Sequence, residues 1–338
     1  MRTRPLRSLV ITLTTAAVLA CGGAADKKDA KKDEAKVAET KTEETKADAP
    51  KGPRVRARAA EEVRMPEPKG RVVAIGGLGG DLATTTAAFK AAGAIDDAGN
   101  WSGGDLVVVQ LGNVLGPGKD EKAVLAMLDK LAESAKAAGG ALYRLNGEQE
   151  ILNVALTFDG VSAKGFKDYA GEKPAADDPR IDGLPKDRRG RAAAFASGGP
   201  VAKKLAEQKF TLVVGDTLFA HGAVLEDHVK EGLDTINKDG KKWMLGESPM
   251  MPNSMADMGP ARSIKLRGAE PFCGGVEQAL SDLAVKRLVI QRGADKSEAN
   301  MCDGKLIRIG AAGGDASGGP EVLEIAGGAT KPIPFAKK

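Results

Sequence analysis

The sequence predicts an α/β domain built on mixed β-sheets. Short apolar runs such as DLVVVQL at 105–111 alternate with helical segments such as the amphipathic stretch 121–138, which is the pattern of strands interleaved with helices. Two further apolar runs, at 210–214 and 217–220, are separated by a two-residue turn, and this spacing predicts a hairpin. A hairpin pairs its strands antiparallel, so both strand directions are expected.

The elements follow one another in a regular order from about Gly70. A strand at 71–75 leads through a glycine turn into a helix at 82–92, which ends before Gly93. The remaining expected elements are the strand 105–111, the helix 121–138 and the strands 141–145, 210–214, 217–220, 286–290, 306–309 and 321–325. We therefore predict one folded domain over residues 70–330 of the 338-residue chain.

The first 20 residues have the pattern of an export signal. A basic start is followed by the apolar run from Leu9 to Ala20, which is too short to span a bilayer as a helix. The run ends in Val-Leu-Ala-Cys, which resembles a bacterial lipobox, so residues 1–20 are predicted to be a lipoprotein signal peptide and Cys21 the lipidated N-terminus. Gly22 follows Cys21 where an inner-membrane signal would have Asp, so we expect the outer membrane, facing the periplasm. A plain signal peptide with a coincidental cysteine is the alternative.

Residues 21–69 are expected to form a disordered Lys/Glu/Ala-rich linker. From Asp26 to Lys69 the chain has 13 basic and 11 acidic residues and almost no large apolar side chain. Such a segment buries too little apolar surface to offset its chain entropy.

Charge and cysteine content narrow the possible functions. The net charge of +4 falls to +1 without Arg2, Arg4 and Arg7 of the signal peptide, since 4 minus 3 is 1, so no nucleic-acid partner is expected. The chain has three cysteines. With Cys21 lipidated, Cys273 and Cys302 form an even pair, which predicts a disulfide in an oxidising compartment; two free thiols are the alternative.

Five glycine-containing loops follow the predicted strands. They read IGGLGGD at 75–81, QLGNVLGPG at 110–118, LNGEQE at 145–150, FAHGAV at 219–224 and VIQRGAD at 289–295. Their order and spacing resemble the calcineurin-like metallophosphoesterases, in particular the bacterial Shewanella-like, phosphoprotein-phosphatase-like branch. The resemblance covers about residues 70–327. It implies a four-layer αββα sandwich with two mixed sheets and a site for two divalent metals (Mn, Fe or Zn), which activate a water for attack on a phosphate ester.

The resemblance places substituted residues at most of the metal positions. In the first loop, Gly77 and Gly79 stand where the family has an Asp and a His ligand. In the second, Asn113 replaces the carboxylate that bridges both metals, and Pro117 replaces the arginine that holds phosphate, while Gly116 stands at another Asp position.

The later loops are altered as well. Glu148 and Gln149 stand where the family has its Asn ligand and the His that assists the leaving group, although the following Glu150 is retained. His221 is the one metal-ligand histidine that is unchanged. Gln291 and Arg292 replace a Gly-His pair, so Arg292 adds a positive charge near a metal position.

These substitutions predict a catalytically inactive phosphatase-like protein. Two dications 3.5–4 Å apart repel by roughly 15–20 kcal/mol at an effective dielectric of 20, and the neutral amide of Asn113 cannot offset that repulsion as a carboxylate would. We expect no bound metal and a binding or scaffold role, with a protein partner or a phosphorylated ligand. The alternative is a divergent metal-dependent phosphoesterase, of the serine/threonine-phosphatase type, with a weak or rearranged metal site.

Several other interpretations remain open at this stage. A dinucleotide site would need a glycine at position 82, which is Leu82, and a serine hydrolase built on His221 lacks a G-x-S-x-G motif. A single cation held by His221, Glu148, Glu150 and Asp81 is a further possibility. The methionine-rich loop from Met250 to Met258 could bind Cu(I) through thioethers, although packing under a loop is the commoner use of methionine. His228 is expected to have a capping or packing role.

Overall fold

The computed structural model describes residues 63–66, 68–174, 177–255, 259–262, 270–292, 299–312 and 321–336. The predicted signal peptide, Cys21, the linker as far as residue 62, Met258 and residues 293–295 of the fifth loop lie outside these ranges.

The described residues form two five-stranded mixed sheets. The first has the strand order β10-β9-β1-β2-β3 and the second the order β4-β5-β6-β8-β7. In the first, the strands β1 (Val72–Ile75), β2 (Val107–Gln110) and β3 (Ala141–Arg144) are parallel, whereas β9 (Glu321–Ala326) runs antiparallel to β1 and to β10 (Ala329–Pro334). In the second, the hairpin of β4 (Thr211–Val214) and β5 (Thr217–Ala220) is followed by β6 (Arg287–Gln291) and β8 (Leu306–Ile309), both parallel to β5, and by the antiparallel edge strand β7 (Asn300–Met301).

The two sheets pack face to face because alternate residues of each strand point to opposite sides. Val72, Ala74 and Val109 of the first sheet share a buried cluster with Phe219 and Val289 of the second. The residues between them on β1 and β2 instead face a second cluster that includes the helices α2 (Leu82–Ala91) and α3 (Glu121–Ala137).

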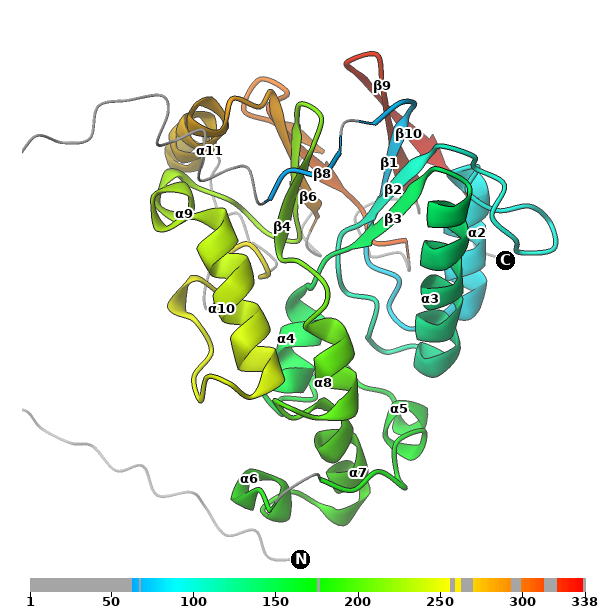
Figure 1. Cartoon of the computed structure of the whole chain (residues 1–338), viewed down its shortest axis with the longest axis vertical. Coiled ribbons are helices and arrows are strands. Elements are labelled where there is room, and N and C mark those ends of the chain that lie inside the picture. The colour runs from blue at the N-terminus through cyan, green and yellow to red at the C-terminus, as the bar shows by residue number, and fades with distance from the viewer. Residues whose placement is uncertain are drawn as a thin grey trace, which may run out of the picture. The chain divides into compact units, whose positions relative to one another are not determined.

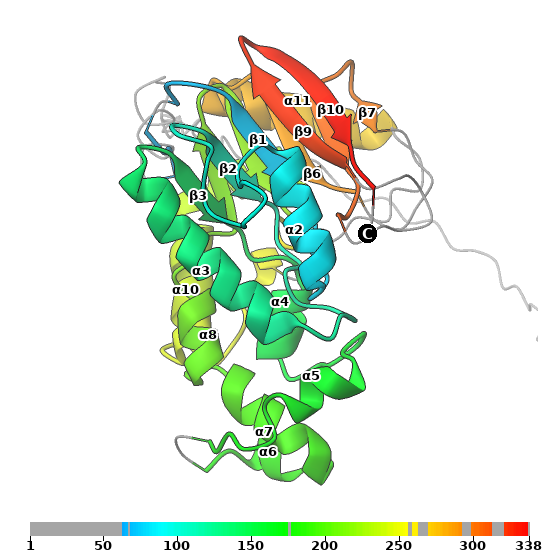
Figure 2. The same ribbon diagram turned by 90° about the vertical axis from the view of Figure 1, so that its right-hand side faces the viewer.

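Helices cover the outer faces of both sheets, which makes the molecule a four-layer αββα sandwich. The helices α2 and α3 lie against the first sheet, as Figures 1 and 2 show. The helix α11 (Glu270–Leu283) packs with α9 (Glu226–Glu231) and against β6, on the outer side of the second sheet (Figure 1). The mixed α/β class predicted from the sequence is confirmed.

A helical segment connects the two sheets. It follows β3 and contains α4 (Glu148–Val154), α5 (Ala163–Lys167), α6 (Pro179–Asp182), α7 (Lys186–Phe195) and α8 (Pro200–Leu205). After the hairpin come α10 (Leu233–Leu245) and a short 3-10 helix, Asn253–Met255. Among the described residues, no helix has the length and apolarity needed to cross a membrane.

The packed region extends beyond the predicted bounds 70–330 at both ends. Val63 is fully buried, and the backbone N–H groups of Met65 and Val213 donate to Val213 O and Val63 O at 2.8 and 2.9 Å. At the other end, β10 continues to Pro334. The end of the expected linker therefore pairs with the exposed edge of β4, the place where unpaired strands are otherwise liable to aggregate.

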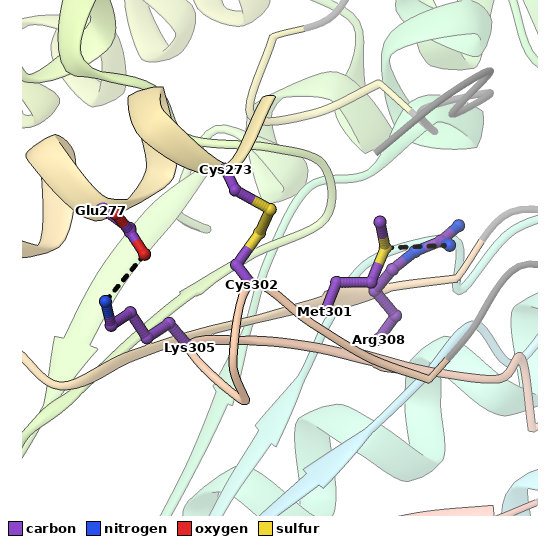
Figure 3. Close-up of a disulfide and its surroundings, with 6 residues drawn as sticks. All are labelled: Cys273, Glu277, Met301, Cys302, Lys305 and Arg308. Atoms are coloured by element: carbon purple, nitrogen blue, oxygen red, sulfur yellow. Dashed lines mark hydrogen bonds and ion pairs between the residues drawn. A yellow bond between two sulfur atoms is a disulfide. The ribbon is translucent and has the colours of Figure 1, made fainter. Parts of the chain in front are cut away.

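A disulfide joins α11 to the β7–β8 turn. Cys273 and Cys302 are 29 residues apart in sequence, and their Cα atoms are 5.2 Å apart. Figure 3 shows a second link beside it, in which Lys305 Nζ donates to Glu277 Oε1 at 2.7 Å. Both connections hold the helix against the outer edge of the second sheet.

Candidate functional site

The first two glycine-containing loops lie together beyond the carboxyl ends of β1 and β2. The backbone N–H groups of Leu78 and Gly79 donate to Asn113 O at 2.9 and 3.0 Å, and Gly118 N–H donates to Gly79 O at 2.7 Å. A Cβ atom on Gly118 would lie only 2.3 Å from the Gly80 carbonyl. The loops can therefore approach this closely only because glycines stand where the two backbones meet.

Gly77 connects the first sheet to the second. Its N–H donates to the Gln291 side-chain oxygen at 2.6 Å, and the Gln291 amide nitrogen donates to Arg292 O at 3.0 Å. A Cβ atom on Gly77 would lie 3.0 Å from the Cβ atom of Asn113 and 3.6 Å from the Gln291 oxygen. The space that a metal-ligating side chain would need at position 77 is thus occupied by neighbouring side chains.

Asn113 occupies the centre of the second loop in a left-handed conformation, with φ of 53°. Asparagine tolerates this region better than most residues. Its side-chain oxygen accepts from Gln149 N–H at 2.8 Å, and its own N–H donates to Glu150 Oε2 at 2.7 Å. The position that resembles the bridging carboxylate is therefore a backbone-binding amide that joins the second loop to the third.

Glu150 is fully buried and organises the same two loops. Its carboxylate also accepts from Leu115 N–H at 3.1 Å and from Gly147 N–H at 2.8 Å, the latter at the start of α4. Burial raises the pKa of this carboxyl, while the bonds from the backbone N–H groups act in the opposite direction. Both carboxylate oxygens are engaged by the protein's own backbone, so the retained Glu150 is a structural residue of the loops.

His221 lies at the carboxyl end of β5 and is fully buried. Its Nδ1 lies 2.8 Å from Leu111 O, so this nitrogen carries a proton and donates to the carbonyl. Burial lowers the pKa of His221 to about 4, which keeps the ring neutral near pH 7. A Cβ atom on Gly147 would lie 2.7 Å from Nδ1, so the ring packs directly on the third loop.

Two arginines come from the second-sheet side of the site. Arg262 forms an ion pair with Glu148 at 3.4 Å, and the two side chains are 27% and 24% exposed. Arg292 is only 8% exposed, and its buried Nε has no hydrogen-bond partner among the described residues. The sequence predicted that Arg292 adds a positive charge near a metal position. Arg262 was not identified as a residue of the site, because its loop carries no recognised motif.

A buried ion pair behind the second loop was also missed from the sequence. Glu121 and Arg191 are both fully buried and lie 2.6 Å apart, and Glu121 also accepts from Gly116 N–H at 3.1 Å. Arg191 Nε donates to Asn153 at 2.8 Å. Arg191 lies in the run KDRRGRAAAF, where three arginines have equivalent sequence surroundings, so no local signal distinguishes the buried one.

The remaining predicted residues lie around this network. Pro117 faces Gly79, since a Cβ atom on Gly79 would lie 3.8 Å from Pro117 Cδ, and Gly79 itself has φ of 62°. The side-chain oxygen of Gln149 is buried and has no hydrogen-bond partner among the described residues.

The residues at the family's metal positions do not fit a pair of divalent cations. Such a site needs several carboxylate and imidazole ligands directed at the ions. Gly77 and Gly79 have no side-chain donor, and the side-chain oxygen of Asn113 already accepts a backbone N–H group. Gln291, beside the metal position of Arg292, accepts another. In the described part of the chain, no group of three or more His, Cys, Asp and Glu side chains is arranged to hold a metal ion.

The single-cation alternative is not brought together either. Asp81 caps α2, where its carboxylate accepts from Thr84 N–H at 2.7 Å, Glu148 pairs with Arg262, and Glu150 binds backbone N–H groups. The capping of α2 by Asp81 also disfavours an anion or dinucleotide phosphate at that helix end.

The structure also bears on two other hypotheses from the sequence, the copper-binding methionine loop and the capping role of His228. Met255 is fully buried in the core, whereas Met250 is 72% exposed, so these two thioethers of the candidate copper loop do not share one environment. His228 accepts a hydrogen bond from Leu225 N–H at 3.0 Å at the start of α9, which confirms its capping role.

Known proteins resemble this chain in sequence and in fold. No protein-family model matches it. Shewanella-like protein phosphatase 2 of Arabidopsis thaliana is 34% identical over 301 residues, which cover 78% of this chain and 77% of the relative.

Two crystal structures of a cold-active protein tyrosine phosphatase, one of them described as from a psychrophilic Shewanella species, match with TM-scores of 0.61 and 0.58. Each match covers 78% of this chain, and the two matches span 78% and 80% of the solved chains. At sequence identities of 17% and 16%, they support the fold alone. On the identity and coverage of the Arabidopsis relative, the chain belongs to the Shewanella-like phosphatase family of the calcineurin-like metallophosphoesterases.

Proposed function

We propose that this chain is a catalytically inactive member of its phosphatase family that binds a partner through the altered site. One observation carries the proposal: polar side chains at or beside the family's metal positions are bound to backbone N–H groups of neighbouring loops. Asn113 binds Gln149, Gln291 binds Gly77, and Glu150 binds three backbone N–H groups. Metal ligands would have to break these bonds before they could coordinate an ion.

The ligand class that fits best is an anion, such as a phosphorylated segment of a protein partner. Arg292 supplies a guanidinium; the residue is 8% exposed, and its Nε has no hydrogen-bond partner among the described residues. A buried charge is costly unless it is paired, so an incoming phosphate would offset that cost through a charge-assisted hydrogen bond.

We further propose that lipid on Cys21 anchors the protein to the outer membrane, facing the periplasm. The apolar run before Cys21 and the polar linker after it support this arrangement. Metabolic labelling with a fatty-acid analogue tests it. The label is expected on the wild-type chain and not on the Cys21→Ser variant, and labelling of both proteins would contradict the proposal.

A divergent metal-dependent phosphoesterase is the second candidate. His221 favours it, because the ring is buried and its pKa of about 4 keeps it neutral, the form that a metal requires. A single neutral histidine with rearranged neighbours would give at most a weak site.

Native mass spectrometry of the purified chain with Mn²⁺ and Zn²⁺ distinguishes the two candidates. The inactive protein is expected to bind neither ion stoichiometrically and to leave an aryl phosphate unhydrolysed, with the Arabidopsis relative as the positive control for turnover. Two bound ions, together with hydrolysis that the His221→Ala variant abolishes, would contradict our proposal and support the enzyme.

The anion is tested separately by titrating the chain with phosphoserine. The Arg292→Gln variant is expected to bind at least tenfold more weakly, whereas Lys242→Gln, which changes an exposed cation on α10, should bind as the wild type does. Equal affinity of all three proteins would exclude Arg292 as the anion site.

A further inference from the structure

A cavity of about 340 Å³ lies away from the candidate site, between α3 and α8. Its volume is at the small end of the range of ligand pockets. Its apolar wall is formed mainly by Leu125 and Ala126 of α3 and by Pro200, Val201 and Leu205 of α8. None of the cavity's lining residues belongs to the phosphatase-like site.

Two buried polar atoms of the cavity-lining residues lack hydrogen-bond partners among the described residues. One is the hydroxyl oxygen of Tyr169, a residue that is only 3% exposed, and the other is the side-chain oxygen of Gln208. The Tyr169 ring is held in place, with Phe195 edge-to-face at 5.0 Å and Lys122 Nζ 4.4 Å from its centroid. Both atoms have almost no accessible surface, so they lie behind the cavity wall, and recognition in the cavity depends on its apolar wall and its charged side chains.

The cavity's residues carry an excess of positive charge. Asp129 is neutralised by Arg144 at 2.8 Å and by Lys204 at 3.8 Å. Lys122 has no ion-pair partner among the described residues, and its ammonium stands over the Tyr169 ring. With Glu172 included, three cations face two carboxylates, which favours an acidic ligand.

We propose that this cavity binds a short acidic peptide segment of a protein partner, with one apolar side chain inserted between α3 and α8. The inserted side chain contacts Leu125 and Val201, and a neighbouring carboxylate of the segment pairs with Lys122.

A fluorinated dipeptide provides a defined probe. N-acetyl-4-trifluoromethylphenylalanyl-glutamate amide is titrated with the full chain, and its ¹⁹F line width reports binding. The exposed residue Ala126 allows the cavity to be blocked, so Ala126→Trp is expected to weaken binding at least tenfold. The matched control is Ala137→Trp, at the exposed end of the same helix, which should bind as the wild type does.

A second variant separates ligand contact from stability. Lys122→Gln removes an exposed cation that has no ion-pair partner among the described residues, so the melting temperature is expected to stay nearly the same while the probe binds at least threefold more weakly. Replacement of the probe's glutamate by lysine should also weaken binding. No binding at millimolar chain, binding that Ala126→Trp leaves unchanged, or equal affinity for the glutamate and lysine probes would each overturn the proposal.

Discussion

Gly77 shows how a single residue shapes the candidate site. Its missing side chain leaves room for both Asn113 and Gln291 close to its Cα, and its N–H is the donor that Gln291 binds at 2.6 Å. A ligand aspartate cannot be restored here without displacing those neighbours. The altered residues therefore depend on one another, and no single reverse substitution is expected to recreate a metal site.

The Gly77→Asp variant tests this dependence. Its Cβ would lie 3.0 Å from the Cβ atom of Asn113, so we expect a loss of about 1–3 kcal/mol in the free energy of unfolding through overpacking. Urea unfolding measures the loss. The matched control is Gly171→Asp, where an added Cβ meets nothing within 4 Å and the change should be below about 0.5 kcal/mol. Unchanged stability at position 77 would contradict the crowded geometry.

His221 makes the stability of the fold depend on pH. Its pKa falls from 6.5 to about 4 on folding because the ring is buried. Between pH 4 and pH 6.5 the unfolded chain binds more protons than the folded chain does. The stabilisation that comes from burying the neutral ring is therefore complete above pH 6.5 and is lost as the pH falls towards 4. The full effect is about 3 kcal/mol.

Urea unfolding between pH 7 and 4.5 measures this effect against the His221→Asn variant, which lacks the titrating ring. Burial raises the pKa of Glu150, so that group acts in the opposite direction, but it is present in both proteins and cancels in the comparison. The wild type is expected to lose more stability on acidification. Parallel pH profiles would show that His221 does not titrate in this range.

At the scale of elements, the strongest signals were the buried central strands. The runs VVAI and VVVQ of β1 and β2 are apolar on both faces, because one face meets the other sheet and the other meets α2 and α3. The strand β10 was not predicted, because Pro332 and Pro334 argue against a strand. It forms as an edge strand paired with β9 alone, where missing N–H donors are tolerated.

The helices α4 to α8, which connect the two sheets, were not predicted from the sequence either. The helix α7 has a buried face of Ala192, Ala193 and Phe195 together with Arg191, and this arginine disrupts any apolar periodicity. Tertiary pairing with Glu121 decides its burial, which no local pattern encodes. The same holds for Glu150, which was retained as a family residue in the sequence but binds three backbone N–H groups of two loops in the structure.

The buried pair of Glu121 and Arg191 connects α3, α7 and the second loop, so breaking it should be costly. Arg191→Met leaves a buried carboxylate without its partner, and we expect a loss of about 3–5 kcal/mol in unfolding free energy. The double variant Glu121→Gln/Arg191→Met removes the charge but keeps an acceptor for Gly116 N–H, so it should recover most of that loss. Lys242→Met, at an exposed ion pair of α10, is the control and should cost under 0.5 kcal/mol. A double variant no more stable than the single one would contradict this account.

The disulfide joins two elements on the outer edge of the second sheet. It closes a loop with a sequence separation of 29 residues, so reduction should lower the free energy of unfolding by about 3–4 kcal/mol. Urea unfolding with and without a reductant measures the difference. The Cys273→Ser/Cys302→Ser variant should match the reduced protein and no longer respond to reductant, whereas Cys21→Ser should behave as the wild type. An equal effect of reductant on the double variant would show that the loss has another source.

At the scale of the whole molecule, the site depends on both sheets. Gly77 and Asn113 belong to loops of the first, while His221 and Gln291 come from the second, and the bond from Gly77 to Gln291 joins the two. Local sequence patterns predicted strands and loops, but only the resemblance of the five loops to a known family predicted that they form one site. The side-chain hydrogen bonds within that site are not specified by a loop motif.

A metal bound at this site would connect the two sheets and would therefore stabilise the entire fold. At 1 mM Mn²⁺, one site with a dissociation constant of 1 μM would add about 4 kcal/mol, which corresponds to a rise of roughly 10 °C in melting temperature for a domain of this size. Because Asn113 and Gln291 already bind backbone N–H groups of neighbouring loops, we expect the melting temperatures in 1 mM Mn²⁺ and in 1 mM EDTA to agree within about 1 °C. A rise near 10 °C that the His221→Ala variant abolished would show that an ion can displace those bonds, and metal would then join the two sheets where the bond from Gly77 to Gln291 joins them now.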